Sequence, residues 1–216
     1  SFDNCGIETL GLSQTFFNCA SIGTTTTVTL FAVDVNGNYA SATAFINVAD
    51  TMAPTVITQN ISVQLGADGQ ATITPAQINN GSTDNCSITS YTLDVMNFTC
   101  ANVGPNTVTL TVTDVNGNVS TGTAIVTVQD LIVPAAISQN ITVQLGINGQ
   151  VAITPAQINS GSFDNCGIAT LTLDITNFTC ANVGANTVTL TVTDVNGNIS
   201  TATAIVTVQD LIAPTV

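Results

Sequence analysis

The sequence repeats with a period of about 80 residues, and this repetition constrains the fold more than any other feature. Residues 54–133 and 134–213 align without a gap and are identical at 60 of 80 positions. Residues 1–53 match the last two-thirds of the same unit, and residues 214–216 match its beginning. Near-identical tandem units are typical of arrays in which each repeat contacts its neighbours. We therefore expect a partial first repeat without its opening strands, two full repeats and the start of a next one.

The partial first repeat has two explanations. A β-sandwich without its opening strands would expose its core, because each sheet must bury its apolar face against another layer. Either this sequence is a window cut from a longer array, or another molecule donates the missing strands.

Each full repeat has the pattern of a β-domain. Residues 107–113 alternate between Thr and an apolar residue, which predicts a half-buried strand with Val108, Leu110 and Val112 facing the core. The Asn-Gly pair that follows is a hairpin-turn signal, and residues 119–128 form the expected partner strand.

Further strands are predicted elsewhere in the same repeat. Residues 61–65 and 70–74 flank a Gly-rich turn and predict a second hairpin, while residues 88–93 predict another strand. Residues 75–78 allow one helical turn at most. Several short strands with regular turns predict an all-β fold, in which Ig-like β-sandwich repeats of about 80 residues are arranged end to end.

The charge composition excludes several classes of partner. The chain has 13 acidic residues and no Lys, Arg or His. It therefore has no cationic side chain to contact nucleic-acid phosphates or an anionic membrane surface. No apolar run is long enough to insert into a membrane. Without cationic side chains, the carboxylates must face water, accept hydrogen bonds or bind cations.

The six cysteines fall into three pairs with 14 positions between partners: Cys5 and Cys19, Cys86 and Cys100, Cys166 and Cys180. An even count with regular spacing favours disulfides over free thiols, and hence an extracellular or cell-surface location. We expect one disulfide inside each repeat. Each such loop would contribute about 3 kcal/mol to stability.

Acidic residues recur at the expected loop ends. In an Ig-like sandwich, the loops that carry Asp84 and Asp114 lie at the end where the chain enters, and Asp50 arrives from the preceding repeat. Clustered carboxylates are costly unless neutralised, and oxygen ligands suit Ca²⁺. We therefore predict Ca²⁺ at each junction, the alternative being solvated loop-end Asp residues. The predicted ligands are Asp50, Asp84, Asp114 and Asn116 at one junction, and Asp130, Asp164, Asp194 and Asn196 at the next.

The order of these motifs resembles the hyalin-repeat (HYR) family of extracellular Ig-like modules. The resemblance is carried by Asp84-Asn85 before a strand, Gly104 before the alternating strand, Gly117-Asn118 in the turn, and the closing segment 126–130 with Pro134. The version with Asp-Asn-Cys and Phe-Thr-Cys resembles repeats of surface and secreted proteins of Bacteroidota-type bacteria. This resemblance covers the whole chain and implies adhesion and surface architecture rather than catalysis.

Catalysis finds no support in the residues present. The chain has no His or Lys with which to build the usual Ser or Cys nucleophile sites. A paired-carboxylate glycosidase is the remaining option, but active sites are rarely copied in every repeat. We predict that the chain is not an enzyme.

Glycans would help to keep an apolar surface soluble. Asn-x-Ser/Thr motifs are glycan acceptors in secreted proteins, and Asp50-Thr51-Met52 resembles the O-glycosylation motif of Bacteroidota. The candidate sites are Thr51, Asn60, Asn97, Asn118, Asn140, Asn177 and Asn198.

These observations predict a structural repeat segment of an extracellular stalk, adhesin shaft or filament, whose partners are copies of itself. Near-identical repeats suggest that length is the selected property. Two alternatives remain: an array of modules that bind carbohydrate or another surface, and an accessory array on a secreted enzyme.

Overall fold

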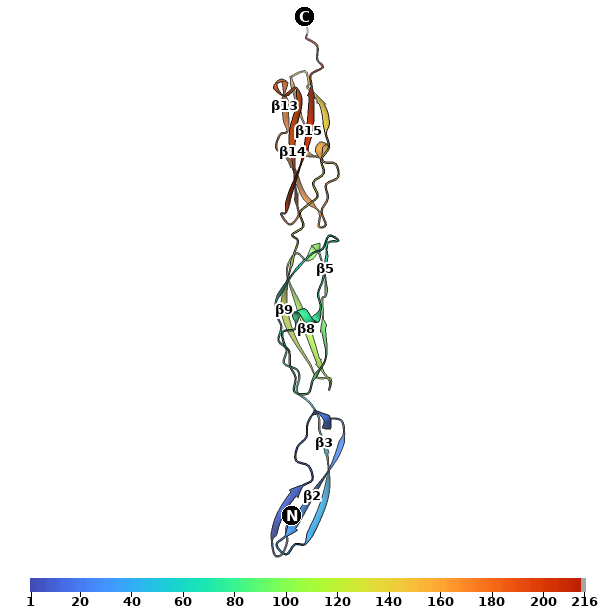
Figure 1. Ribbon diagram of the computed structural model, residues 1–216, viewed down its shortest axis with the longest axis vertical. Coiled ribbons are helices and arrows are strands. Elements are labelled where there is room, and N and C mark those ends of the chain that lie inside the picture. Colours follow the sequence, from blue (N-terminus) through green and yellow to red (C-terminus); the bar gives the residue numbers. More distant parts are fainter. Residues whose placement is uncertain (215–216) are drawn as a thin grey trace. The chain divides into compact units, whose positions relative to one another are not determined.

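The computed structural model describes residues 1–214 (Figure 1). Residues 215–216, part of the predicted start of a next repeat, lie outside the described residues. Strands are the main regular structure of the described chain and its helices are single short turns, which confirms the predicted all-β fold. The first repeat contains β1 (Ile7–Leu12), β2 (Thr25–Asp34), β3 (Tyr39–Asn47) and the 3₁₀ helix η1 (Cys19–Ser21).

The second and third repeats contain the same elements, displaced by 80 residues. The second has β4 (Ile61–Gln64), β5 (Gln70–Thr72), α1 (Pro75–Ile78), β6 (Ile88–Leu93), β7 (Asn97–Thr99), η2 (Cys100–Asn102), β8 (Gly104–Asp114) and β9 (Val119–Gln129). The third has β10 (Ile141–Gln144), β11 (Gln150–Ala152), α2 (Pro155–Ile158), β12 (Ile168–Leu173), β13 (Asn177–Thr179), η3 (Cys180–Asn182), β14 (Gly184–Asp194) and β15 (Ile199–Gln209).

Two sheets form the sandwich of the third repeat. The larger sheet has the order β10-β15-β14-β12, and the smaller one pairs β11 with β13. β14 and β15 form the expected antiparallel hairpin around an Asn-Gly turn, whereas β10 adds to β15 in parallel. The second repeat has the same order, β4-β9-β8-β6 and β5-β7. The first repeat has one sheet, β1-β2-β3.

Strand alternation builds the core as predicted. In the third repeat Val188, Leu190 and Val192 of β14 are fully buried, and so are their counterparts Val108, Leu110 and Val112 of β8. The Thr residues between them are only partly buried, because successive side chains of a strand point to opposite faces. Phe178 of β13 packs into the same core from the smaller sheet. The alternation of apolar residues with Thr therefore gives each long strand one buried face and one partly exposed face.

The predicted second hairpin is wrong. β4 pairs with β9, and β5 pairs with β7, so the two strands belong to different sheets. The Gly-rich turn between them carries the chain from one sheet to the other, closed by the bond from the Gly66 N–H to the Gln70 carbonyl. Short alternating runs on either side of a turn do not distinguish a hairpin from such a crossing.

The chain divides into two compact units whose boundary runs through the second repeat. The first unit comprises Ser1–Thr58, Asn79–Thr92 and Leu110–Gly122. The second comprises Gln59–Ile78, Leu93–Thr109 and the described chain from Thr123 onward. Each junction between consecutive repeats consequently lies inside one unit.

No helix among residues 1–214 is both long enough and apolar enough to cross a membrane.

Candidate metal centres at the repeat junctions

Three carboxylates meet at the junction between the second and third repeats. Asp130 follows β9, Asp164 precedes β12, and Asp194 ends β14. One oxygen from each lies within 4.8 Å of the other two. Asp130 and Asp194 are almost completely buried, with 5% and 1% of their surface exposed. The strand ends that the sequence singled out therefore converge as predicted.

Backbone and amide N–H groups fix each carboxylate in place. The Asp194 Oδ1 atom accepts bonds from the backbone N–H groups of Asn196 and Asn198, both at 2.8–2.9 Å, which closes the hairpin turn around the side chain. The Asp164 Oδ1 atom accepts bonds from the N–H groups of Cys166 and Gly167. These bonds hold the carboxylates at fixed positions without neutralising their charge.

Asp194 Oδ2 accepts from the Asn198 amide at 2.8 Å, but other oxygens at this junction lack donors. The Oδ2 atoms of Asp130 and Asp164 are buried without a hydrogen-bond partner, and so are the Oδ1 atoms of Asn165 and Asn196. A buried polar atom without a partner is costly, and a buried anionic one is more so. Two carboxylate oxygens and two amide oxygens at this junction are therefore free to act as ligands of a cation.

The preceding junction has the same arrangement. Oxygens of Asp50, Asp84 and Asp114 lie within 4.8 Å of one another. Asp50 Oδ2 and Asp84 Oδ1 are again buried without a partner. Asp114 Oδ1 accepts from the N–H groups of Asn116 and Asn118, as Asp194 does from their counterparts. The geometry is thus a property of the repeat rather than of one junction.

Hydrogen bonds lower the pKa of two of the turn carboxylates, Asp114 and Asp34. Burial by itself raises the pKa of Asp114, but the Asn118 amide and the N–H groups of the turn outweigh it and lower the pKa below 3.8. In the first repeat, the Asn38 amide is the main cause that lowers the pKa of the equivalent Asp34. Asp114 is therefore an anion at neutral pH, although it is buried and no cationic side chain exists to pair with it.

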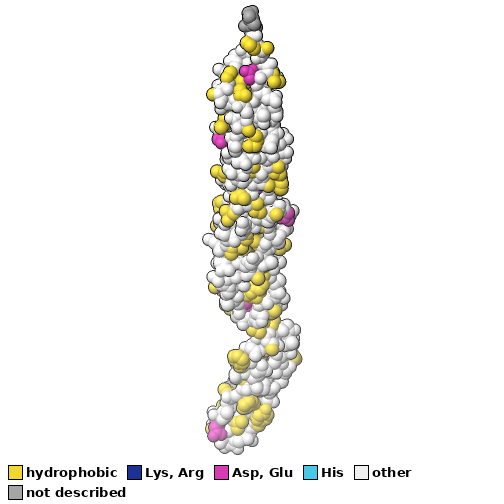
Figure 2. Space-filling model, turned by 45° about the horizontal axis from the view of Figure 1, so that its top comes forward, with side chains coloured by type: hydrophobic (Ala, Val, Ile, Leu, Met, Phe, Trp, Pro, Cys, Tyr) yellow, Lys and Arg dark blue, Asp and Glu magenta, His cyan; other side chains and the backbone are white. Residues whose placement is uncertain are grey.

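The donor set suits a hard divalent cation. Ca²⁺ takes six to eight oxygen ligands in flexible geometry, whereas Mg²⁺ requires near-ideal octahedral positions. The second cluster offers carboxylates from three separate segments, and the buried amide oxygens of Asn165 and Asn196 lie in two of those segments, so the donors are of the kind that Ca²⁺ takes. The surface in Figure 2 carries acidic side chains at a few scattered places and no basic ones.

The structure distinguishes among the other predicted ligands. Asn196 contributes a buried, unpartnered oxygen, whereas its counterpart Asn116 is exposed.

Sequence reasoning missed two positions that hold the site together. Asn118 donates to both the Asp50 carbonyl and Asp114, and Asn165 donates to Asp130 at 3.3 Å. Both asparagines recur in every repeat, Asn118 as the last residue of the Asp-Val-Asn-Gly-Asn turn at 114–118 and Asn165 in the Asp-Asn-Cys turn, and this recurrence was the available signal.

The disulfides join different repeats. Cys19 of the first repeat is bonded to Cys86 of the second, and Cys100 of the second to Cys166 of the third. The predicted pairing within each repeat is wrong, and Cys5 and Cys180 are free in the described chain. Every disulfide here spans 66 or 67 residues instead of 14.

Strand geometry explains why the two cysteines of one repeat are not bonded to each other. Between Cys166 and Cys180 the chain runs along the six residues of β12, a rise of about 20 Å, and then enters β13 in the other sheet. The two cysteines of one repeat are thereby separated. Cys166 instead lies two residues after Asp164, so the same loop supplies a disulfide partner and a carboxylate at the junction.

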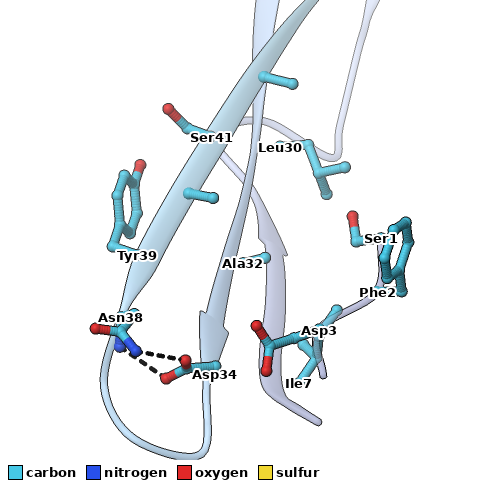
Figure 3. Close-up of a pocket in the computed structure, with 12 residues that line it drawn as sticks. Ser1, Phe2, Asp3, Ile7, Leu30, Ala32, Asp34, Asn38, Tyr39 and Ser41 are labelled. Carbon is cyan, nitrogen blue, oxygen red and sulfur yellow. Dashed lines mark hydrogen bonds between the residues drawn. The ribbon is translucent and has the colours of Figure 1, made fainter. Parts of the chain in front are cut away.

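A groove of about 390 Å³ lies in the first repeat (Figure 3). Leu30 and Ala32 of β2 line it and are partly exposed, whereas their counterparts Leu110 and Val112 are fully buried. Asp34 lies at its edge, bonded to Asn38. Residues 1–53 contain no counterpart of β4, β5 and α1. The groove is therefore the uncovered core face expected for the partial repeat.

The glycosylation candidates differ in their environment. Thr51, Asn60, Asn97, Asn140 and Asn177 are exposed. Asn118 and Asn198 are half-buried, and their amide nitrogens each donate two bonds at the acidic clusters. A glycan on either would remove one of those N–H groups, so glycan attachment and cluster support compete at these two positions.

Comparisons with known proteins leave the family open. No family model matches the chain, and no curated protein matches it. Among solved structures it is similar to extracellular cadherin domains 1–4 of protocadherin gamma B7, with 13% identity, 95% of this chain and 66% of that one covered, and a TM-score of 0.38. It is also similar to Sidekick-1 immunoglobulin domains 1–4, with 11% identity, 86% and 58% covered, and a TM-score of 0.39. Similarity this weak says nothing about what this chain binds.

Proposed function

We propose that the chain is a structural repeat segment of an extracellular stalk, adhesin shaft or filament, in which each junction is locked by a disulfide and by Ca²⁺. The observation that carries this proposal is the presence of both features at both junctions: a disulfide between consecutive repeats and a cluster of three carboxylates. An oxidising, extracellular setting follows from the use of structural disulfides.

The disulfide supports a load-bearing role. Consecutive repeats are already joined by the backbone, as in the linker 130–134, where Pro134 restricts φ. The Cys100–Cys166 bond adds a second covalent connection at a different point. Two connections restrict rotation between repeats far more than one. A chain that only needed flexible spacing would gain nothing from the second bond.

Ca²⁺ would restrict the same junction further. Asp130 belongs to the linker that leaves the second repeat, whereas Asp164 and Asp194 belong to the third. A cation held by all three connects both sides of the junction. It also removes the repulsion among three anions that the chain has no Lys, Arg or His to neutralise.

The remaining parts of the proposal rest on the residues alone. Hyalin-repeat membership, an origin in Bacteroidota-type bacteria, glycans on the exposed candidate sites and the absence of catalysis stay proposals. An array of carbohydrate-binding modules is the alternative, but no second observation in the described residues favours it.

Isothermal titration of the whole chain with Ca²⁺ tests the metal. We expect two sites, one for each junction, and a higher melting temperature with Ca²⁺ than with EDTA. At a Ca²⁺ concentration about 1,000 times Kd, binding to the folded state adds about 4 kcal/mol per site. Absence of binding heat, together with an unchanged melting temperature in EDTA, would refute the metal.

Matched variants assign the sites. Asp114→Asn and Asp194→Asn should each abolish one of the two sites and leave the other. Asp94→Asn makes the same change of charge away from both clusters and should leave both sites intact. Loss of both sites in either cluster variant, or of any site in Asp94→Asn, would contradict the assignment.

A further inference from the structure

We infer that the disulfide and the acidic cluster of a junction are coupled: the Cys100–Cys166 bond raises the affinity of the cluster for Ca²⁺, and bound Ca²⁺ stabilises the bond against reduction. This inference rests on the proposed Ca²⁺ function and adds to it a dependence on the redox state of the cysteines. All residues of this junction lie in one compact unit. The coupling follows from loop 164–166, which takes part in both features.

The cysteine of this loop ties it to the second repeat. Cys166 is bonded to Cys100, with 5.3 Å between their Cα atoms, a separation that two free thiols do not enforce. The Cys100 sulfur also lies 3.5 Å from the Asn165 carbonyl oxygen. A Cβ placed on Gly69 would lie 3.0 Å from that oxygen and 3.0 Å from that sulfur, so the loop packs against the glycine and the disulfide together. The disulfide therefore fixes the loop against the second repeat.

The same loop carries oxygens of the acidic cluster. One oxygen of Asp164 lies within 4.8 Å of oxygens of Asp130 and Asp194. Asp164 Oδ2 and the side-chain oxygen of Asn165 are buried without a partner. The Asn165 amide nitrogen donates to Asp130 at 3.3 Å, which places this amide group beside the cluster. The loop thus offers the cation a carboxylate and an amide oxygen.

The two features are connected over three consecutive residues. The Cys166 N–H donates to Asp164 Oδ1 at 2.8 Å, and the Asn165 amide nitrogen lies 3.5 Å from the Cys166 sulfur. Each residue has only two soft backbone dihedrals, so a displacement of Cys166 from its partner also displaces Asp164. Groups that orient metal ligands typically change metal affinity about 10- to 100-fold. Reduction of the disulfide should weaken Ca²⁺ binding by a factor in this range.

The disulfide also closes a ring that includes ligands from both sides of the junction. Asp130 follows β9 of the second repeat and Asp164 precedes β12 of the third, and both lie between residues 100 and 166. Ring closure reduces the number of arrangements open to this segment. Ca²⁺ then meets ligands that are already near their bound positions, and such preorganisation raises affinity because less ordering accompanies binding.

The first junction has the same contacts. The Cys86 N–H donates to Asp84 at 2.8 Å, and the Asn85 amide donates to Asp50 at 3.3 Å. The Cys19 sulfur, bonded to Cys86, lies 3.5 Å from the Asn85 carbonyl oxygen. These residues belong to the other compact unit. A loop that joins disulfide and cluster therefore occurs at both junctions.

Coupling between two equilibria is reciprocal. If the disulfide raises the Ca²⁺ affinity about 10-fold, saturating Ca²⁺ lowers the reduction potential of the disulfide by about 30 mV. Dithiothreitol, a dithiol, is the reductant considered. One of its thiolates attacks a sulfur of the disulfide, and its second thiolate then closes the reagent into a cyclic disulfide. Two electrons and two protons pass to the protein, which leaves Cys100 and Cys166 as thiols.

Titration calorimetry with Ca²⁺ tests the effect of the disulfide on the metal. Asp114→Asn serves as the background, since it removes the first site and leaves only the second to be observed. Adding Cys100→Ser and Cys166→Ser should weaken binding at this site about 10- to 100-fold. Adding Cys19→Ser and Cys86→Ser is the matched control, because it removes the other disulfide, and it should leave the affinity unchanged. Circular dichroism checks that each variant folds.

Reduction of the unmodified chain tests the effect of the metal on the disulfide without any cysteine variant. The chain is equilibrated at constant ionic strength in mixtures of reduced and oxidised dithiothreitol, with either Ca²⁺ or EDTA. Free thiols are then alkylated, and mass spectrometry of peptic peptides measures each disulfide separately. We expect Ca²⁺ to lower the midpoint potential of both disulfides by about 30 mV or more. In Asp194→Asn, Ca²⁺ should lower only that of Cys19–Cys86.

Equal Ca²⁺ affinity with and without the Cys100–Cys166 bond would overturn the inference and leave the proposed function standing. An unchanged midpoint potential in Ca²⁺ would do the same. An equal shift of this bond in Asp194→Asn would also overturn it, because Ca²⁺ would then act without the cluster. Absence of binding heat in the oxidised chain would overturn the proposed function and the inference together.

Discussion

The loss of stability on replacing Cys100 and Cys166, singly and together, tells whether these two residues form one disulfide with each other or belong to two separate disulfides. In the structure they share one bond, so Cys100→Ser, Cys166→Ser and the double variant all remove the same cross-link. The cost of the double variant should therefore be close to that of either single one. Pairing within each repeat would instead make them members of two different bonds, and their costs would add.

The loop lengths set the magnitude. The Cys100–Cys166 bond spans 66 residues, and chain-entropy arguments give about 4 kcal/mol for a loop of that size. If the second repeat stays folded while the third unfolds, the free part of the loop runs from about residue 130 to residue 166, and the same relation still gives about 4 kcal/mol. Two loops of 14 residues would contribute about 3 kcal/mol each. The double variant should thus lose about 4 kcal/mol, against about 6 kcal/mol for pairing within repeats.

Urea unfolding followed by far-ultraviolet circular dichroism is the assay, because the chain has no Trp and only two Tyr. Cys86→Ser with Cys100→Ser is the matched control. Those residues belong to two different bonds in the structure, so their costs should add. Additivity for Cys100 and Cys166, combined with non-additivity for the control pair, would refute the cross-repeat arrangement.

Three further predictions address the junction, the surface and the core. Asn198→Ala should weaken Ca²⁺ binding at the second junction about 10- to 100-fold in titration calorimetry, since this amide holds both Asp130 and Asp194; unchanged affinity would show that the amide has no positioning role. The Thr109 N–H lowers the pKa of Asp94 below 3.8, so Asp94 stabilises the fold above that pH and loses its contribution as the pH falls through the lowered pKa. Asp94→Asn should cost up to about 1 kcal/mol at pH 7, a difference that shrinks as the pH falls from about 5 through the lowered pKa of Asp94; a constant difference in acid unfolding curves would contradict this role. Ile158→Ala, at a fully buried position, should cost about 2–5 kcal/mol in urea unfolding, and a loss under about 1 kcal/mol would show that α2 does not pack in the core.

The long strands and the acidic clusters were predictable from the sequence. Alternation from 107 to 113 determines which face of β8 is buried, because the side-chain period of a strand is two. The clusters followed from topology, since Asp84 and Asp114 lie at strand ends that meet at the same edge of an Ig-like sandwich. The third carboxylate, Asp50, was predictable because an Asp also follows the last strand of each repeat, where the chain enters the next one.

The disulfide partners were not predictable in the same way. Six cysteines allow 15 pairings, and spacing along the chain does not choose among them. Cys86 and Cys100 are near in sequence, yet each is bonded to a residue more than 60 positions away. The choice depends on which loops meet at a junction between repeats. For the same reason, the predicted hairpin of residues 61–65 and 70–74 is wrong, because the strands that form there, β4 and β5, lie in different sheets.

Peptide mapping of the non-reduced chain tests the central claim most directly, namely that the disulfides connect consecutive repeats. Pepsin at low pH is the suitable protease, because the chain has no Lys or Arg for trypsin and because protonated thiols do not exchange. We expect mass spectrometry to identify peptides that join Cys19 to Cys86 and Cys100 to Cys166. Peptides that join Cys86 to Cys100 and Cys166 to Cys180 would contradict the account.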